Sequence, residues 1–208
     1  MGVPEENVIL LLNAGQVKMN TSISKMKLLA KISGGKAELI FYYAGHGLPD
    51  ETSKEPYLIP VDVSGNNMSY AIKLKDVYKQ LSEYPSERIT IFLDACFSGG
   101  ARDQALLAVR GVRIKPQEEA VSGRIIVFSA SSGEQSASAY KEKTHGMFTY
   151  YLLKKMQETN GNVSYSELGN YINEKVSLKS VLVNEKEQNP QILFSPELQG
   201  KWESWTFN

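Results

Sequence analysis

Three nearly continuous apolar runs constrain the fold of this chain most strongly. They are "ELIFYYA" (38–44), "RITIFLDA" (88–95) and "RIIVFSA" (124–130), and each is rich in β-branched or aromatic residues. Runs of this kind are typical of strands that are covered on both faces, as in a parallel sheet. Two further runs, "NVILLL" (7–12) and "PQILFS" (190–195), also predict strands.

Amphipathic segments between these runs predict helices at 22–32, 74–84, 146–157 and 164–176. The last segment opens with a Ser-x-x-Glu capping box, from Ser164 to Glu167. Because strands alternate with helices, we expect an α/β fold with helices on both faces of a mostly parallel sheet. The length of 208 residues fits a single domain over 1–208.

The charge balance and the cysteine count narrow the classes of function. Lys+Arg and Asp+Glu both number 23, which gives no electrostatic footprint for nucleic acid. No apolar run is long enough to cross a bilayer, so we expect no membrane partner. The start, "MGVPEENVILLL", lacks the basic leader of a signal peptide, and the compartment stays open. A single cysteine forms neither an internal disulfide nor a multi-cysteine metal site.

A histidine and the only cysteine follow two of the predicted strands directly. His46 stands in "YYAGHG" (42–47), and Cys96 stands in "DACFSGG" (94–100). The carboxyl ends of neighbouring parallel strands meet at one edge of a sheet, so both side chains are expected there. Taken singly, a buried cysteine is usually a small apolar residue. Together, the two residue types suit a nucleophilic thiol with an imidazole base.

These two motifs resemble those of the caspase-like cysteine peptidases, and most closely the metacaspases and bacterial caspase homologues. "FSASSGEQSA" (128–137) and "GMFTYYLL" (146–153) extend the resemblance through most of the chain. It implies a caspase-like three-layer sandwich and a thiol protease, or peptidase of family C14, with a catalytic dyad of His46 and Cys96. It further implies that the backbone N–H groups of Gly47 and Cys96 stabilise the oxyanion of the tetrahedral intermediate.

The same resemblance assigns a pocket for the residue that precedes the scissile bond. Asp94, two positions before the cysteine, would line it, together with Ala44 and Ser129. A carboxylate there attracts a cation, which predicts cleavage of proteins or peptides after Arg or Lys. The alternative is that Asp94 only caps backbone amides at the end of its strand. Ala44 departs from the family, since many metacaspases have serine at this position.

A long basic loop, 99–123, separates a larger part (1–98) from a smaller part (124–208). In the resembled family the chain is often cut in this region during activation of a zymogen. Mobile loops with small and polar residues are preferred sites of proteolysis. We therefore predict self-cleavage within the loop, first after Arg110 and then after Arg113 or Arg102. The alternative is a merely solvated basic loop.

Two departures from the family concern the start of the chain and calcium. The resembled proteins have a strand and a helix before the segment that matches 3–12, so we expect the chain to lack the family's first strand and helix. Calcium-dependent members carry paired acids where this chain keeps only Asp76. Asp62 and Asp103 are scattered and do not make a hard-cation site. We therefore expect no cofactor and no metal, and calcium dependence is doubtful.

Other interpretations of the chain stay open. A catalytically silent caspase-like module that acts by binding is the main alternative to an enzyme. A flavodoxin-like domain for a small anion has less support, because no Gly-rich phosphate loop follows the first strand. His145, the second histidine, is expected at the start of a helix rather than in catalysis. The closing "KWESWTFN" is expected to pack over the sheet edge. The sequence leaves the oligomeric state undetermined.

Overall fold

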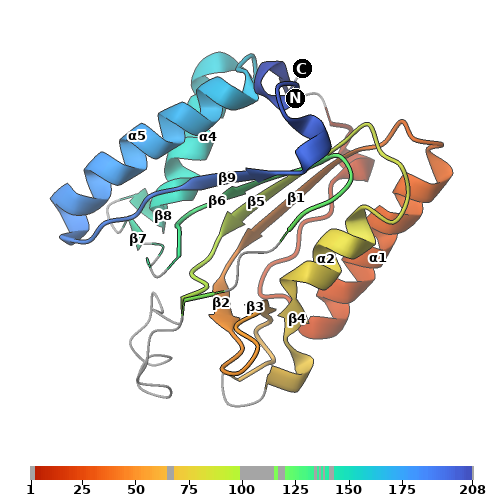
Figure 1. Cartoon of the computed structure of the whole chain (residues 1–208), viewed down its shortest axis with the longest axis horizontal. Coiled ribbons are helices and arrows are strands. Elements are labelled where there is room, and N and C mark those ends of the chain that lie inside the picture. The colour runs from red at the N-terminus through yellow and green to blue at the C-terminus, as the bar shows by residue number, and fades with distance from the viewer. Residues whose placement is uncertain are drawn as a thin grey trace.

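The computed structural model describes residues 3–64, 68–98, 115–116, 120–133, 135, 137, 139–140 and 143–207. A central four-stranded sheet has the order β1-β5-β6-β9 (Figure 1). Its strands are β1 (Glu38–Ala44), β5 (Arg88–Asp94), β6 (Ile125–Ser129) and β9 (Gln191–Phe194). The first three are parallel, and β9 runs antiparallel to β6. Four of the five predicted strands are thereby confirmed.

Helices cover both faces of this sheet, as the alternation of strands and helices predicts. On one face lie α1 (Gln16–Ile32) and α2 (Leu74–Leu81), and on the other lie α4 (Met147–Thr159) and α5 (Tyr165–Asn184) (Figure 1). The predicted capping box is present at the start of α5, where Ser164 accepts from the Glu167 N–H. The fold is the expected three-layer sandwich of a mostly parallel sheet between two layers of helices.

The two faces of the sheet carry separate apolar clusters because neighbouring residues along a strand point to opposite faces. Ile91 of β5 and Val127 of β6 pack against α1 and α2. Phe92 and Phe128, the next residues in each strand, pack against α4 and α5. Both strands are therefore buried on both faces, which explains their continuous apolar sequences.

The strand predicted at 7–12 is wrong. After a short 3-10 helix, η1 (Glu5–Asn7), the chain continues without regular structure. Val8 is 57% exposed and Leu10 is 76% exposed. A strand forms only where it finds a pairing edge, and the apolar composition of this run says nothing about whether one is within reach. Among the described residues, no strand pairs with the second edge of β1.

A second, smaller sheet continues from β1 and was not predicted. It has the order β2-β3-β4, with β2 (His46–Pro49), β3 (Pro56–Ile59) and β4 (Ile72–Lys73) antiparallel. These strands are short, and β2 and β3 contain Gly or Pro, so their composition is typical of turns. A two-stranded ribbon of β7 (Ala139–Tyr140) and β8 (His145–Gly146) precedes α4.

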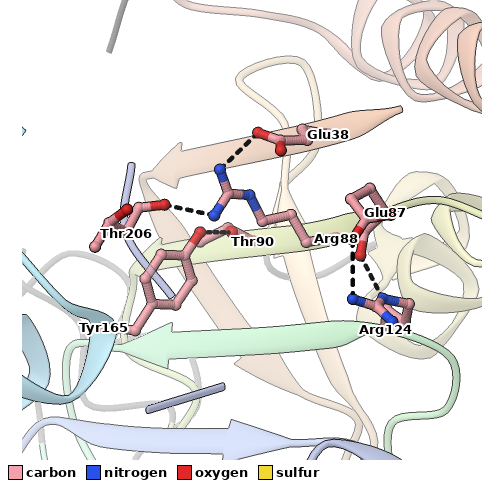
Figure 2. Close-up of polar contacts among 7 residues, drawn as sticks. All are labelled: Glu38, Glu87, Arg88, Thr90, Arg124, Tyr165 and Thr206. Atoms are coloured by element: carbon pink, nitrogen blue, oxygen red, sulfur yellow. Dashed lines mark hydrogen bonds and ion pairs between the residues drawn. The ribbon is translucent and has the colours of Figure 1, made fainter. Parts of the chain in front are cut away.

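Polar contacts join the sheet to α5 and to the C-terminal tail at the amino end of the parallel strands (Figure 2). Arg88 Nη2 lies 2.7 Å from Glu38 Oε2, and Arg88 Nη1 donates to the Thr206 carbonyl oxygen. The Thr90 and Tyr165 hydroxyl oxygens are 2.6 Å apart. Burial raises the pKa of Tyr165, so this phenol stays protonated.

The aromatic tail packs as expected. It carries two 3-10 helices, η4 (Pro196–Leu198) and η5 (Trp202–Ser204). Trp202 is buried, and the Phe207 ring stacks on the Tyr165 ring with centroids 4.4 Å apart. Phe207 also stacks on Phe92 of the sheet, so the tail closes the core at this end.

Candidate active site

The segments that carry His46 and Cys96 leave the sheet side by side. β1 and β5 are parallel neighbours, as predicted, and Ala44 pairs with Asp94 at their last positions. The Gly45 N–H then donates to the Asp94 carbonyl oxygen at 3.2 Å, which extends the pairing by one residue. β2, whose first residue is His46, therefore begins beside the end of β5.

Gly47 makes the closest approach between the two segments. A Cβ built on Gly47 would lie 2.8 Å from the Cys96 carbonyl oxygen and 2.6 Å from the ring of Phe97. Real Cβ atoms do not approach other atoms this closely, so only glycine fits without a shift of its neighbours. The backbone beside His46 thus lies directly against the backbone of Cys96.

Tyr43 braces the turn that presents His46. Its hydroxyl donates to the His46 carbonyl oxygen at 2.7 Å and approaches the Ile59 carbonyl oxygen at 3.2 Å. Ile59 is the partner of His46 in the β2–β3 pairing. The hydroxyl of Tyr43 therefore fixes the backbone of His46 and of its partner strand. The sequence did not indicate this role of Tyr43.

The thiol of Cys96 is covered by the segment that follows β6. Cys96 is only 4% exposed. The Ala137 N–H donates to Cys96 Sγ at 2.6 Å, and Sγ lies 3.3 Å from the Ala137 carbonyl oxygen. The backbone of Ala137 therefore lies directly against this sulfur.

Gln135 holds this covering segment in place from two sides. Its carbonyl oxygen accepts from Ser98 Oγ at 3.2 Å, which joins the segment to the cysteine loop. Its side-chain Oε1 accepts from the Asn189 N–H at 2.8 Å, which joins it to the loop before β9. Nearby, the fully buried Gln188 donates from Nε2 to the Ala130 carbonyl oxygen at 2.9 Å.

Asp94 is fully buried at the end of β5, against the start of α4. Its Oδ2 accepts from Thr149 Oγ1 at 2.5 Å and from the Thr149 N–H at 3.3 Å. The Thr149 hydroxyl oxygen also lies 2.7 Å from the Tyr42 hydroxyl oxygen. Asp94 therefore caps a backbone N–H at the start of α4. This is close to the alternative in which Asp94 only caps backbone amides, although the amide belongs to α4 and not to the end of β5. Its predicted role in substrate binding stays a prediction.

The two remaining residues assigned to the substrate pocket lie on different faces of the sheet. Ala44 is exposed and is paired with Asp94, so both share the α4–α5 face. Ser129 pairs with Leu93, which belongs to the α1–α2 face. The register therefore does not bring Ser129 to Asp94, because one step along a strand reverses the side chain. On the α4–α5 face, the fully buried Ala130 lies where Ser129 was expected.

Three predicted self-cleavage residues, Arg102, Arg110 and Arg113, lie outside the described residues, as does Asp103. The end of the predicted linker is described in part. Val121 there is 5% exposed and belongs to the α1–α2 core cluster. Val121, near the end of the linker, is therefore packed against the domain.

The remaining polar candidates lie at or beside the starts of helices. Both carboxylate oxygens of Asp62 accept from the Gln16 N–H, at 2.9 and 3.2 Å, which caps α1. Asp76 lies in the first turn of α2. His145 is exposed in β8, directly before α4, so it precedes a helix as expected. Within the described part of the chain, no three metal-ligating side chains gather, and no helix is long and apolar enough to span a membrane.

Comparisons with known proteins agree with the fold. The family model described as the caspase domain matches residues 7–198. No curated protein shows significant sequence similarity to the chain. The structure of protein GSU0716 from Geobacter sulfurreducens is similar, with a TM-score of 0.61 at 18% identity over 88% of this chain and 74% of that one. Caspase-1 from Spodoptera frugiperda is similar too, with a TM-score of 0.57 at 16% identity over 90% of this chain and 71% of that one.

Proposed function

The chain belongs to the caspase domain family, and we propose that it is a cysteine endopeptidase with a catalytic dyad of His46 and Cys96. The observation that carries the proposal is the close approach of Gly47 to the Cys96 backbone. It supports the proposal because the residue after His46 lies against the backbone of the only cysteine of the chain, at the carboxyl edge of a parallel sheet. Sites of α/β sheets lie at this edge.

In the proposed reaction the Cys96 thiol gives its proton to His46, and the sulfur attacks the carbonyl carbon of the scissile bond. The backbone N–H groups of Gly47 and Cys96 donate to the oxyanion that forms. His46 then protonates the leaving amine as the C–N bond breaks, which leaves a thioester on Cys96. Water hydrolyses the thioester and restores the thiol. The mechanism needs no metal or cofactor.

For the substrate, we propose proteins or peptides with Arg or Lys before the scissile bond. The support is the carboxylate of Asp94, which is buried two residues before the nucleophile. A buried carboxylate pairs strongly with a cation, and arginine can engage it with two parallel hydrogen bonds. We further propose that the chain cuts itself after Arg110 and, secondarily, after Arg113 or Arg102, whose basic side chains suit the same pocket.

Fluorogenic peptides with Arg, Lys or Asp before the reporter test this proposal. We expect turnover of the Arg and Lys peptides and equal loss of turnover in Cys96→Ala and His46→Ala. A preference for the Asp peptide would contradict the assignment of Asp94. For self-cleavage, the intact mass of the wild type should show two fragments, while Cys96→Ala stays whole. Cleavage that persists in Cys96→Ala would come from another protease.

A catalytically silent binding module is the second candidate, and the covered thiol favours it. Cys96 is 4% exposed and in contact with Ala137, which suits a resting or inactive site. Labelling with iodoacetamide or an arginyl chloromethylketone separates the two candidates, because the chain has a single cysteine. An enzyme should react with the chloromethylketone faster than a free thiol does. Slower reaction with both reagents would favour the silent module.

A further inference from the structure

A chain of hydrogen bonds leads from the open edge of the sheet to the carboxylate of Asp94. Tyr42, on β1, is 46% exposed, and its hydroxyl oxygen lies 2.7 Å from Thr149 Oγ1. Thr149 Oγ1 lies 2.5 Å from Asp94 Oδ2. Tyr42, Asp94 and Thr149 come from β1, β5 and α4, so the contact joins two strands to the helix that covers them.

The direction of donation along this chain follows from chemistry. An ionised carboxylate only accepts hydrogen bonds, so the Thr149 hydroxyl donates its single proton to Asp94. That proton is then not available for Tyr42. The Tyr42 hydroxyl must therefore donate to Thr149 Oγ1, and the chain runs from Tyr42 through Thr149 to Asp94. Hydrogen bonds aligned in one direction polarise and strengthen one another.

The backbone of α4 adds a second donor to the same carboxylate oxygen. Thr149 is the third residue of α4, so its N–H belongs to the first turn, whose amides have no partner within the helix. This N–H donates to Asp94 Oδ2 at 3.3 Å. Two donors from one residue on one oxygen fix the rotation of the carboxylate, and the positive end of the helix lies beside its charge.

We propose that Thr149 and Tyr42 are positioning residues that set the specificity of the pocket at Asp94. The inference rests on the proposed function, because it assumes that Asp94 receives the basic side chain of the substrate. Thr149 holds the carboxylate at a fixed orientation and compensates its burial. Tyr42 directs the Thr149 hydroxyl toward Asp94 rather than toward another acceptor. Without them the carboxylate rotates. The preference of the pocket for a cation over a neutral group of the same shape then falls.

The test compares a peptide with arginine before the reporter with the same peptide carrying citrulline, a neutral isostere of arginine. The variants are Thr149→Val and Tyr42→Phe, each of which deletes only the hydroxyl function. Matched controls are Thr159→Val at the far end of α4, where the hydroxyl donates to the Lys155 carbonyl oxygen, and Tyr70→Phe at an exposed site. Thr149→Ser restores the hydroxyl.

In Thr149→Val we expect the ratio of kcat/KM between the arginine and citrulline peptides to fall roughly tenfold or more, the value of a hydrogen bond to a charged group. In Tyr42→Phe it should fall roughly fivefold, as for a neutral hydrogen bond. Thr149→Ser should recover the wild-type ratio, and both controls should keep it. The rate of iodoacetamide labelling at Cys96 should stay within about twofold throughout, since the reagent is neutral and does not use the pocket.

Distinct results separate failure of this inference from failure of the proposed function. A wild type that prefers arginine, with an unchanged ratio in Tyr42→Phe and Thr149→Val, overturns the positioning role and leaves the peptidase in place. An equal loss for both peptides also overturns it, because the residues would then act on the fold and not on specificity. A wild type that cleaves neither peptide overturns the proposed function and this inference with it.

Discussion

Replacement of Gly47 by alanine tests whether the contact between the histidine and cysteine segments supports the reaction. The new Cβ would lie 2.8 Å from the Cys96 carbonyl oxygen, about 0.6 Å closer than the 3.4 Å at which ordinary contact begins. The backbone of one segment must therefore yield. Overpacking of this kind costs about 1–3 kcal/mol of stability, or roughly 2–10 °C in Tm for a domain of this size.

Turnover should fall even under conditions in which the variant stays folded. A displacement approaching 1 Å at a catalytic group can lower the rate roughly 100-fold. A forced separation of about 0.6 Å should accordingly lower kcat/KM for an Arg peptide roughly 10- to 100-fold. The assay is peptide turnover at a temperature well below the Tm of the variant, with the Tm followed by circular dichroism.

Gly169→Ala is the control for overpacking, because it creates a still closer contact elsewhere, 2.2 Å from the end of a side chain. A Cβ on Gly169, in α5, would meet Cδ1 of Ile192 in β9, a contact without part in the cysteine site. This variant should keep its turnover whatever happens to its Tm. The reasoning is refuted if Gly47→Ala retains wild-type turnover, since the close approach would then have no bearing on the dyad.

Three further predictions concern the covering segment and the start of α5. Gln135→Ala should speed iodoacetamide labelling of Cys96 roughly fivefold, because it removes the acceptor for the Asn189 N–H; an unchanged rate would mean that other contacts hold the segment. Ser164→Ala should lower the free energy of unfolding by about 1 kcal/mol in urea titrations, through loss of the cap. Hydrogen bonds from Ser164 lower the pKa of Glu167, so the ionised Glu167 carboxylate stabilises the fold. This contribution is complete above the ordinary glutamate pKa and is lost as the pH falls through the lowered pKa of Glu167. Stability between about pH 5 and pH 3 should therefore fall more in the wild type than in Glu167→Gln, and parallel curves would contradict this.

The strands of the central sheet were predictable because burial on both faces leaves an unbroken apolar sequence. Ile91 and Phe92 of β5, for example, pack into apolar clusters on opposite faces, so both are apolar. The run at 7–12 has the same appearance and yet is exposed. Whether an apolar run becomes a strand depends on an unpaired edge within reach, and this is a property of the whole fold. The small β2–β3–β4 sheet was not predicted for the opposite reason, since its strands are short and the Gly and Pro of β2 and β3 are typical of turns.

The candidate site was predictable as far as strand ends determine it. The motifs of His46 and Cys96 follow neighbouring parallel strands, so their proximity follows from topology alone. The partners of these residues depend on tertiary packing. Thr149 is 55 positions from Asp94, and Ala137 is 41 positions from Cys96. No local pattern marks either contact, although the position of Thr149 in the first turn of a predicted helix shows that its N–H needs an outside acceptor.

The open edge of β1 has a consequence for work with the protein in solution. Within the described residues, no strand pairs with this edge, and Ile40 in β1 is 40% exposed. The backbone N–H and C=O groups of an edge strand can pair with a strand from another molecule. Exposed apolar residues at Val8 and Leu10 add to the tendency to associate. Self-association should therefore grow with protein concentration, and rates of labelling and turnover are best measured over a dilution series.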